Sequence, residues 1–164
     1  MIHSVVDTNV LVVANGSDNA STTCRLAALG RLNEVTQSRS LLLDSGAEIF
    51  AEYQKHCNYS GQPGIGDEFF RWAHEHQGWL RRFDLTPHAD RYFQEFPDDP
   101  ALETFDPADR KFVAVSIAAS SASSPVPNEI VNAVDSDYSH HQQALSRAGV
   151  AVAELCPTDL KQAS

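Results

Sequence analysis

Acidic residues recur at one kind of position in this chain, where a short apolar segment meets polar residues or where a helix begins. They are Asp7, Asp44 with Glu48, Asp109, and Asp135 with Asp137. A carboxylate at the end of a buried strand is a candidate metal or acid/base group, because ligands gather at the carboxyl ends of parallel strands. Any one of these acids alone is better explained as a turn residue or helix cap. Their repetition at equivalent places favours a shared site.

The order of the expected elements would carry these acids to one cleft. Strands are expected near residues 2–6, 40–43, 82–85, 129–135 and 150–155, with helices near 21–32, 45–56, 67–80, 106–119 and 138–148. This alternation predicts an α/β fold, with a mostly parallel sheet covered on both faces and its helix-feeding strand ends at one edge. Clustered carboxylates repel one another unless cations are present. Hard oxygen ligands select Mg²⁺ or Mn²⁺, which serve phosphodiester hydrolysis.

Two residues compete for the second acidic position. Asp44 directly follows the run Leu41–Leu43, whereas Glu48 lies four residues later, in the expected helix. Ser45-x-x-Glu48 fits a capping box, and Asp44 could equally be the cap. Both acids lie between the end of an expected strand and the first turn of the next helix, so both stay candidates.

The helix that begins around Asp109 has a clear start signal. Asp106 is the expected N-cap and Pro107 the first helical residue. Arg110 and Lys111 follow and are candidates for contacts with substrate phosphates. A solvated pair of cations at a helix start is the simpler interpretation of the same two residues.

Composition limits the class of protein. A chain of 164 residues with 42% apolar residues is expected to form a single domain over residues 1–157, with a frayed tail over 158–164. No apolar run is long enough for a membrane span, and the start lacks a secretory pattern, which predicts a cytoplasmic protein without membrane partners. Three cysteines, Cys24, Cys57 and Cys156, form no CxxC pair and are expected to be reduced. The net charge of −10 disfavours nucleic-acid binding through the surface at large, but allows a local basic patch.

Four short motifs follow one another in a fixed order. They are Val5–Leu11 around Asp7, Glu48 in the second expected helix, Asp109–Val115, and Asn132–Tyr138. In this combination nearly the whole chain resembles the PIN-domain nucleases. Two features depart from that family's usual pattern: Ala133 stands where a threonine is common, and the segment 58–105 is long and aromatic.

The resemblance implies a three-layer α/β/α sandwich with a five-stranded parallel sheet. It also implies a metal-dependent endoribonuclease that acts on RNA, often as the toxin partnered by an antitoxin protein. Asp7, Glu48, Asp109 and Asp135 would be the catalytic metal ligands for Mg²⁺ or Mn²⁺, with Asp137 as an additional ligand. Thr8 and Asn9 would not bind the metal themselves but would orient Asp7 or its bound water.

Other functions stay open at this point. The same acids could belong to a catalytically weak module that binds RNA or a partner protein. An aspartyl-phosphate phosphotransferase also begins with a strand and an Asp, but Asn9 occupies the place where such enzymes commonly carry a second acid. The aromatic stretch 69–79 is most simply core, with a homodimer face or an antitoxin groove as alternatives.

Overall fold

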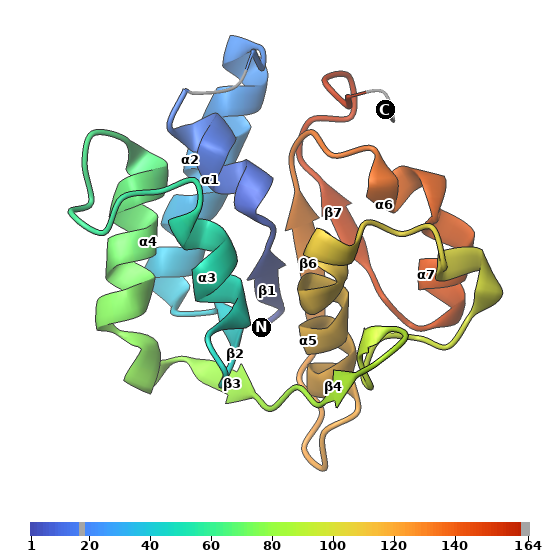
Figure 1. Ribbon diagram of the computed structural model, residues 1–164. Helices are drawn as coiled ribbons and strands as arrows, with labels where there is room; N and C mark the ends of the chain where they lie inside the picture. The colour runs from blue at the N-terminus through green and yellow to red at the C-terminus, as the bar shows by residue number, and fades with distance from the viewer. Residues whose placement is uncertain (17–18, 162–164) are drawn as a thin grey trace.

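The computed structural model describes residues 1–16 and 19–161, and these ranges form a mixed α/β fold (Figure 1). Within them, no helix is both long enough and apolar enough to cross a membrane. The elements are, in chain order, β1 (His3–Val6), α1 (Thr8–Ala14), α2 (Thr22–Ser38), β2 (Leu42–Asp44), α3 (Glu48–Gln54), α4 (Ile65–Glu75), η1 (Gln77–Trp79), β3 (Arg81–Phe83), β4 (Pro87–His88), β5 (Tyr92–Phe93), η2 (Pro100–Leu102), η3 (Pro107–Asp109), α5 (Arg110–Ser120), β6 (Asn128–Asn132), α6 (Asp137–His140), α7 (Gln142–Arg147) and β7 (Val152–Glu154).

Parallel strands occupy the centre of the molecule. β1, β6 and β7 form a three-stranded parallel sheet in the order β1-β6-β7, and β2 pairs with β3 in a second parallel sheet. One isolated parallel bridge, Ser4–Leu41, connects β1 to the chain just before β2. The prediction of a parallel α/β sheet is therefore confirmed. The described strands form two sheets joined by one bridge rather than one regular sheet.

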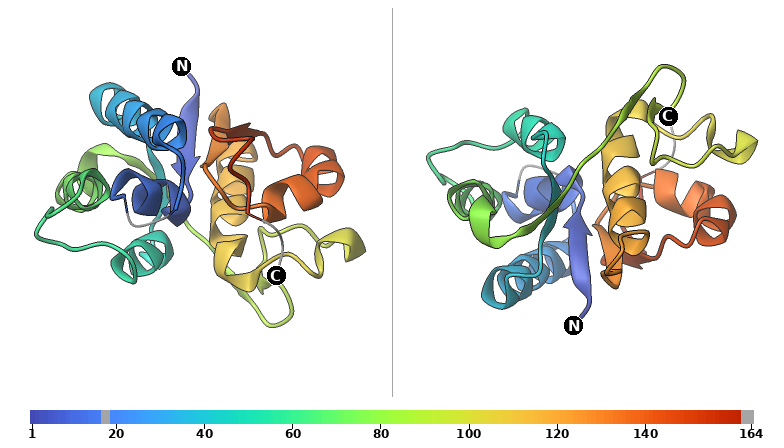
Figure 2. Two further views of the ribbon diagram at one scale, coloured as in Figure 1. Left: turned by 90° about the horizontal axis from the view of Figure 1, so that it is seen from above. Right: turned by 90° about the horizontal axis from the view of Figure 1, so that it is seen from below.

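Helices lie on both sides of the central strands. Figure 2 shows α1 to α4 gathered on one side of β1 and α5 to α7 on the other. α5 packs against strands of both sheets, namely β1, β2, β3 and β6. Its residues from Phe112 to Val115 are fully buried, since small and apolar side chains allow the helix to approach the strands closely. α5 thus holds the two sheets together and carries Asp109 at its start.

The helix α1 is absent from the predicted elements. The β-branched run Val10–Val13 follows β1 directly, and its composition resembles a strand. The turn into α1 is made by Asp7, whose carboxylate accepts a hydrogen bond from the backbone N–H of Asn9. Asp7 therefore directly follows β1 and is also the N-cap of α1.

The prediction of reduced cysteines is wrong for two of the three. Cys24 in α2 and Cys156 after β7 form a disulfide across 132 positions, and Cys57 is free and buried. The prediction of a frayed tail is also wrong as far as Lys161. Asp159 accepts hydrogen bonds from the backbone N–H and Oγ of Ser21, at 2.7 and 3.0 Å. Residues 162–164 of the predicted tail lie outside the described ranges.

Candidate metal centre

Three carboxylates from distant parts of the chain meet at one place. Asp7 follows β1, Asp109 ends η3 before α5, and Asp135 follows β6. One oxygen from each lies within 4.8 Å of the others. They line an open hollow of about 300 Å³ whose walls also include Thr8, Asn9 and Glu52. The prediction that the topology would bring these three acids together is confirmed.

Asp7 is held by hydrogen bonds to both of its carboxylate oxygens. Oδ1 accepts from the backbone N–H of Asn9 at 3.0 Å and from its side-chain amide at 2.8 Å. Oδ2 accepts from the hydroxyl of Tyr138 at 2.6 Å. Asp7 is buried, so these donors replace the water that the carboxylate would otherwise bind. The rotamer of Asp7 is therefore fixed before any ligand arrives.

Asn9, in the first turn of α1, also connects this helix to the loop that carries Asp135. Its amide nitrogen donates to Oδ1 of Asn132 at 2.9 Å, and its Oδ1 accepts from the backbone N–H groups of Ala133 and Val134 at 2.9 and 3.1 Å. Asn9 thus lies where the prediction places it, in direct contact with Asp7. Thr8 differs, because within the described residues its buried Oγ1 has no hydrogen-bond partner although it borders the hollow.

Asp109 is positioned by the start signal that the sequence predicts. Asp106 caps η3 by accepting from the backbone N–H of Ala108 at 3.0 Å, and Pro107 occupies the first turn. Asp109 is thereby placed at the junction of η3 and α5, where it is buried. Asp106 is therefore the helix cap, whereas Asp109 belongs to the acidic cluster. An explanation as a helix cap holds for Asp106 and not for Asp109.

The electrostatics of the cluster fit a divalent cation. Burial raises the pKa of Asp7 to about 6, against the hydrogen bonds from Asn9 and Tyr138. Burial and the charges of Asp7 and Asp135 raise the pKa of Asp109 to about 11. Ionisation of all three carboxyl groups at once is therefore unfavourable when no cation is bound. Clustered hard oxygen donors, with the unpartnered Thr8 hydroxyl beside them, suit Mg²⁺ or Mn²⁺.

Glu48 does not join the cluster, which corrects the sequence prediction. It is exposed in the first turn of α3 and does not line the hollow. Asp44, the competing residue, is buried and accepts from the backbone N–H groups of Glu48 and Ile49 at 2.8 and 2.9 Å. Asp44 is thus the structural residue of the pair, and the expected Ser45–Glu48 capping box does not form because Ala47 is the N-cap.

Glu52, one turn further along α3, faces the hollow instead. It is 7% exposed and lies on the buried stripe that contains Ile49 and Tyr53. The spacing i, i+3, i+4 from Ile49 would have revealed it, since a carboxylate on an apolar helix stripe requires a polar partner or a function. The resemblance to the PIN-domain nucleases points instead to Glu48, one turn earlier on the same helix.

Lys111 is a partner of Glu52 rather than an exposed phosphate contact. Oε2 of Glu52 accepts from Nζ of Lys111 at 3.0 Å and from Nζ of Lys55 at 3.1 Å. Burial alone would raise the pKa of Glu52, but these hydrogen bonds outweigh it, and the pKa is lowered. Lys111 is buried, so the predicted free cation at this helix start is wrong.

Arg110 is also unavailable to a phosphate. Its guanidinium donates to the backbone carbonyls of Leu102, Glu103 and Phe105, at 2.9 to 3.3 Å. The same group stacks 4.6 Å from the centre of the Phe96 ring. Arg110 is 5% exposed and organises the segment that leads into Asp109. Its predicted role in phosphate binding is therefore wrong.

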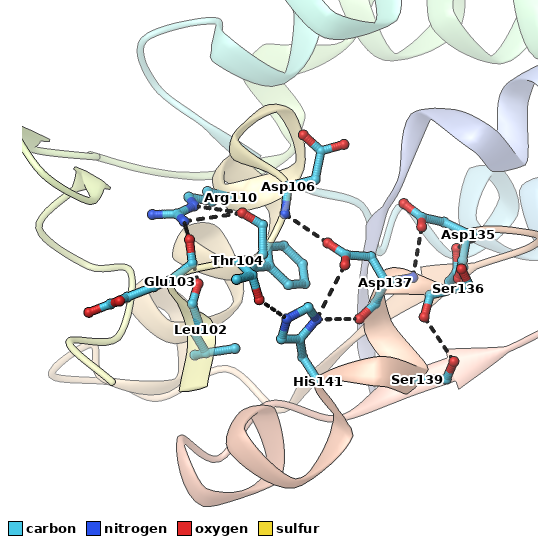
Figure 3. A network of polar contacts seen from close by, with 12 residues as sticks. Leu102, Glu103, Thr104, Asp106, Arg110, Asp135, Ser136, Asp137, Ser139 and His141 are labelled. Carbon is cyan, nitrogen blue, oxygen red and sulfur yellow. Dashed lines mark hydrogen bonds and ion pairs between the residues drawn. The ribbon is translucent and has the colours of Figure 1, made fainter. Parts of the chain in front are cut away.

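Asp137 lies beside the cluster but is engaged elsewhere, as Figure 3 shows. Its Oδ2 accepts from the backbone N–H of Asp106 at 2.8 Å, and its Oδ1 lies 3.2 Å from Nδ1 of His141. Nε2 of His141 lies 3.0 Å from Oγ1 of Thr104. The prediction of Asp137 as an additional metal ligand is not supported by this geometry. Asp137 instead ties α6 to the segment before Asp109.

Comparisons with family models, curated proteins and solved structures found no match to this chain. What the site can do is therefore argued from its own side chains. It combines three clustered carboxylates, an unpartnered hydroxyl at Thr8, and a lysine-paired Glu52, around a hollow open to solvent.

Proposed function

We propose that this protein is a Mg²⁺- or Mn²⁺-dependent endoribonuclease whose ion is held by Asp7, Asp109 and Asp135. The observation that carries the proposal is the convergence of these carboxylates within 4.8 Å from three distant segments. The resemblance of the surrounding motifs to the PIN-domain nucleases supplies the choice of RNA as substrate.

The proposed fold is the three-layer α/β/α sandwich of that family. In this proposal, the strands act as one parallel sheet in the order β3-β2-β1-β6-β7. Three observations support it: both described sheets are parallel, the Ser4–Leu41 bridge links them, and the backbone N–H of Ser4 donates to the carbonyl of Ser40 at 2.8 Å. α5 contacts strands of both sheets, which favours a continuous layer.

Each residue of the hollow has a distinct task in the proposed reaction. A bound Mg²⁺ or Mn²⁺ supplies Lewis acidity at the phosphoryl oxygen and a lowered pKa for its water. Asp7 is kept in one orientation by Asn9 and Tyr138, and the ordering of a ligand by such neighbours strengthens metal binding. Thr8 lines the hollow, and its buried hydroxyl has no hydrogen-bond partner within the described residues. Glu52 keeps the ammonium group of Lys111 at the wall of the site.

Cleavage of single-stranded RNA tests the proposal. A mixed-sequence RNA is incubated with wild-type protein, Asp7→Asn or Glu48→Gln in the presence of Mn²⁺, Mg²⁺ or EDTA. We expect cutting by the wild type in either metal and none in EDTA, with a loss of about a hundredfold in Asp7→Asn. Glu48→Gln is the matched control, because its carboxylate is exposed and outside the hollow. Cutting that persists in EDTA, or that Asp7→Asn retains, would overturn the proposal.

A further inference from the structure

We propose that a cluster of arginine and tryptophan side chains at the amino ends of β2 and β3 binds single-stranded RNA. This amino-edge patch consists of Arg39, whose guanidinium lies over the Trp79 ring, and of Arg81 and Arg82, which follow Trp79 by two and three residues and extend from opposite faces of β3. It lies apart from the three carboxylates and would give the protein a second contact with its substrate. The choice of RNA rests on the proposed function, whereas the stacking and charge arguments rest on the patch itself.

Trp79 presents a large aromatic surface to solvent. Its side chain is 63% exposed, unlike Phe69 and Phe70 of α4, which are buried and confirm the prediction that this aromatic stripe is core. The ring of His76 lies 4.7 Å from the Trp79 ring, and the guanidinium carbon of Arg39 lies 4.7 Å from the Trp79 ring centre. An exposed tryptophan flanked by histidine and arginine is a surface on which bases stack, whatever their sequence.

The arginines of the patch are not neutralised by acids. Within residues 1–16 and 19–161, Arg39, Arg81 and Arg82 form no ion pair, and all three are exposed. Arg71 and Arg147 are exposed arginines that are paired with Glu75 and Asp99, whereas Arg25 is a further exposed arginine without an ion pair among the described residues. Although the protein has a net charge of −10, the patch therefore carries positive charge that no ion pair neutralises. Phosphate groups are the partners that such guanidinium groups bind best.

The neighbouring His3 responds to the same positive charge. Burial lowers the pKa of His3, and the charges of Arg81 and of the chain's amino group lower it further. His3 begins β1 and Arg81 begins β3, so the charge of Arg81 acts at the amino end of β1 as well.

The patch and the carboxylates lie at opposite ends of the parallel strands. Arg39 precedes β2 and Trp79 immediately precedes Leu80 and β3, whereas Asp7 and Asp135 follow β1 and β6. Figure 1 shows β3 beyond the lower end of α4, away from the junction between β1 and α1. A short oligonucleotide could therefore occupy the patch without reaching the carboxylates. A longer strand could contact both, which would favour longer RNA as the substrate.

RNA binding in EDTA tests the patch without any metal. Fluorescence anisotropy of a labelled single-stranded RNA of about ten nucleotides is measured for wild type, Trp79→Ala and a triple variant, R39A/R81A/R82A. We expect both variants to bind at least about tenfold more weakly, and the triple variant to show a shallower salt dependence. Arg71→Ala is the matched control, since Arg71 is an exposed arginine that is already paired with Glu75.

A second measurement reports contact with Trp79 directly. Trp72→Phe leaves Trp79 as the one tryptophan of the chain, and bound RNA should then quench its fluorescence. Absence of RNA binding by the wild type, or wild-type affinity in the triple variant, would overturn the inference. Asp7→Asn should bind RNA normally in EDTA. If the patch variants bind RNA as the wild type does while the wild type still cuts RNA with Mn²⁺, only the inference about the patch is wrong. If the patch binds RNA as expected but the wild type does not cut it, only the proposed function is wrong.

Discussion

The hydroxyl of Tyr138 donates a 2.6 Å hydrogen bond to Oδ2 of Asp7, across 131 positions of the chain. Tyr138 lies in α6, directly after the segment that supplies Asp135. The same short stretch therefore provides one carboxylate of the cluster and fixes another. Oδ1 of Asp7 is held from the opposite side by Asn9. The two residues that fix Asp7 thus come from α1 and α6.

Removing this hydroxyl should weaken metal binding. In Tyr138→Phe, Asp7 loses the donor that holds Oδ2, and a hydrogen bond that lowers the pKa of Asp7 disappears. We expect affinity for Mn²⁺ to fall by about tenfold, measured by isothermal titration calorimetry. Tyr59→Phe is the control, because Tyr59 is exposed and does not line the hollow. Equal affinity in wild type and Tyr138→Phe would show that Asp7 does not depend on this contact.

The raised pKa of Asp7 makes a prediction about stability in EDTA. The unfolded chain loses the Asp7 proton near 3.8, whereas the folded protein keeps it until about pH 6. Between these values the folded state binds more protons, so its stability falls as pH rises. We expect the unfolding free energy of wild type, relative to Asp7→Asn, to fall by about 3 kcal/mol across this window, because one pKa unit corresponds to about 1.4 kcal/mol.

Urea unfolding at a series of pH values measures this difference. Above about pH 6 the difference should go on falling, because the charge of Asp7 helps to raise the pKa of Asp109 and Asp7→Asn removes that charge. Addition of Mn²⁺ should stabilise the wild type more than Asp7→Asn, because only the wild type has the full carboxylate set. A difference that does not change with pH would contradict the electrostatic account of the cluster.

Two glutamates on the same helix allow a sharp test of position. Glu52 is buried at the hollow and paired with Lys111, whereas Glu48 is exposed one turn earlier. We expect Glu52→Gln to lower the rate of metal-dependent RNA cleavage by about tenfold, because the hollow then loses the carboxylate that holds Lys111. Glu48→Gln should cut at the wild-type rate. Slower cleavage by Glu48→Gln than by Glu52→Gln would show that Glu48, and not Glu52, belongs to the site.

The main outline of the site could be predicted because its signals are local. Asp7, Asp109 and Asp135 each follow a strand or open a helix, and the parallel topology then brings them together. The cap at Asp106 is equally local and was predictable for the same reason. α1 was missed, because the β-branched residues of Val10–Val13 favour a strand and only the fold imposes a helix there.

Errors arose where a side chain's partner is distant in the sequence. Lys111 resembles a solvated cation until Glu52 is found 59 positions away. Arg110 resembles a phosphate ligand until the carbonyls of the preceding segment surround it. Asp137 is withdrawn from the cluster by the backbone of Asp106, 31 positions earlier. No spacing rule in a single sequence specifies such contacts.

The disulfide predicts that reductant will destabilise the protein. Cys24 and Cys156 close a loop of 132 positions, for which chain entropy gives a stabilisation of about 5 kcal/mol. We expect dithiothreitol to lower the urea midpoint of wild type and of Cys57→Ser, in which the bridge is intact. Cys156→Ser should start from a lower midpoint and should not respond. An identical midpoint for wild type with and without reductant would contradict the pairing.

Crystals soaked in Mn²⁺ test the central claim most directly, through the anomalous signal of the ion. The account predicts a strong anomalous peak among Asp7, Asp109 and Asp135, and loss of that peak in crystals of Asp109→Asn. A peak elsewhere in the molecule, or none at a Mn²⁺ concentration that supports cleavage, would contradict the assignment of these three carboxylates as the metal site.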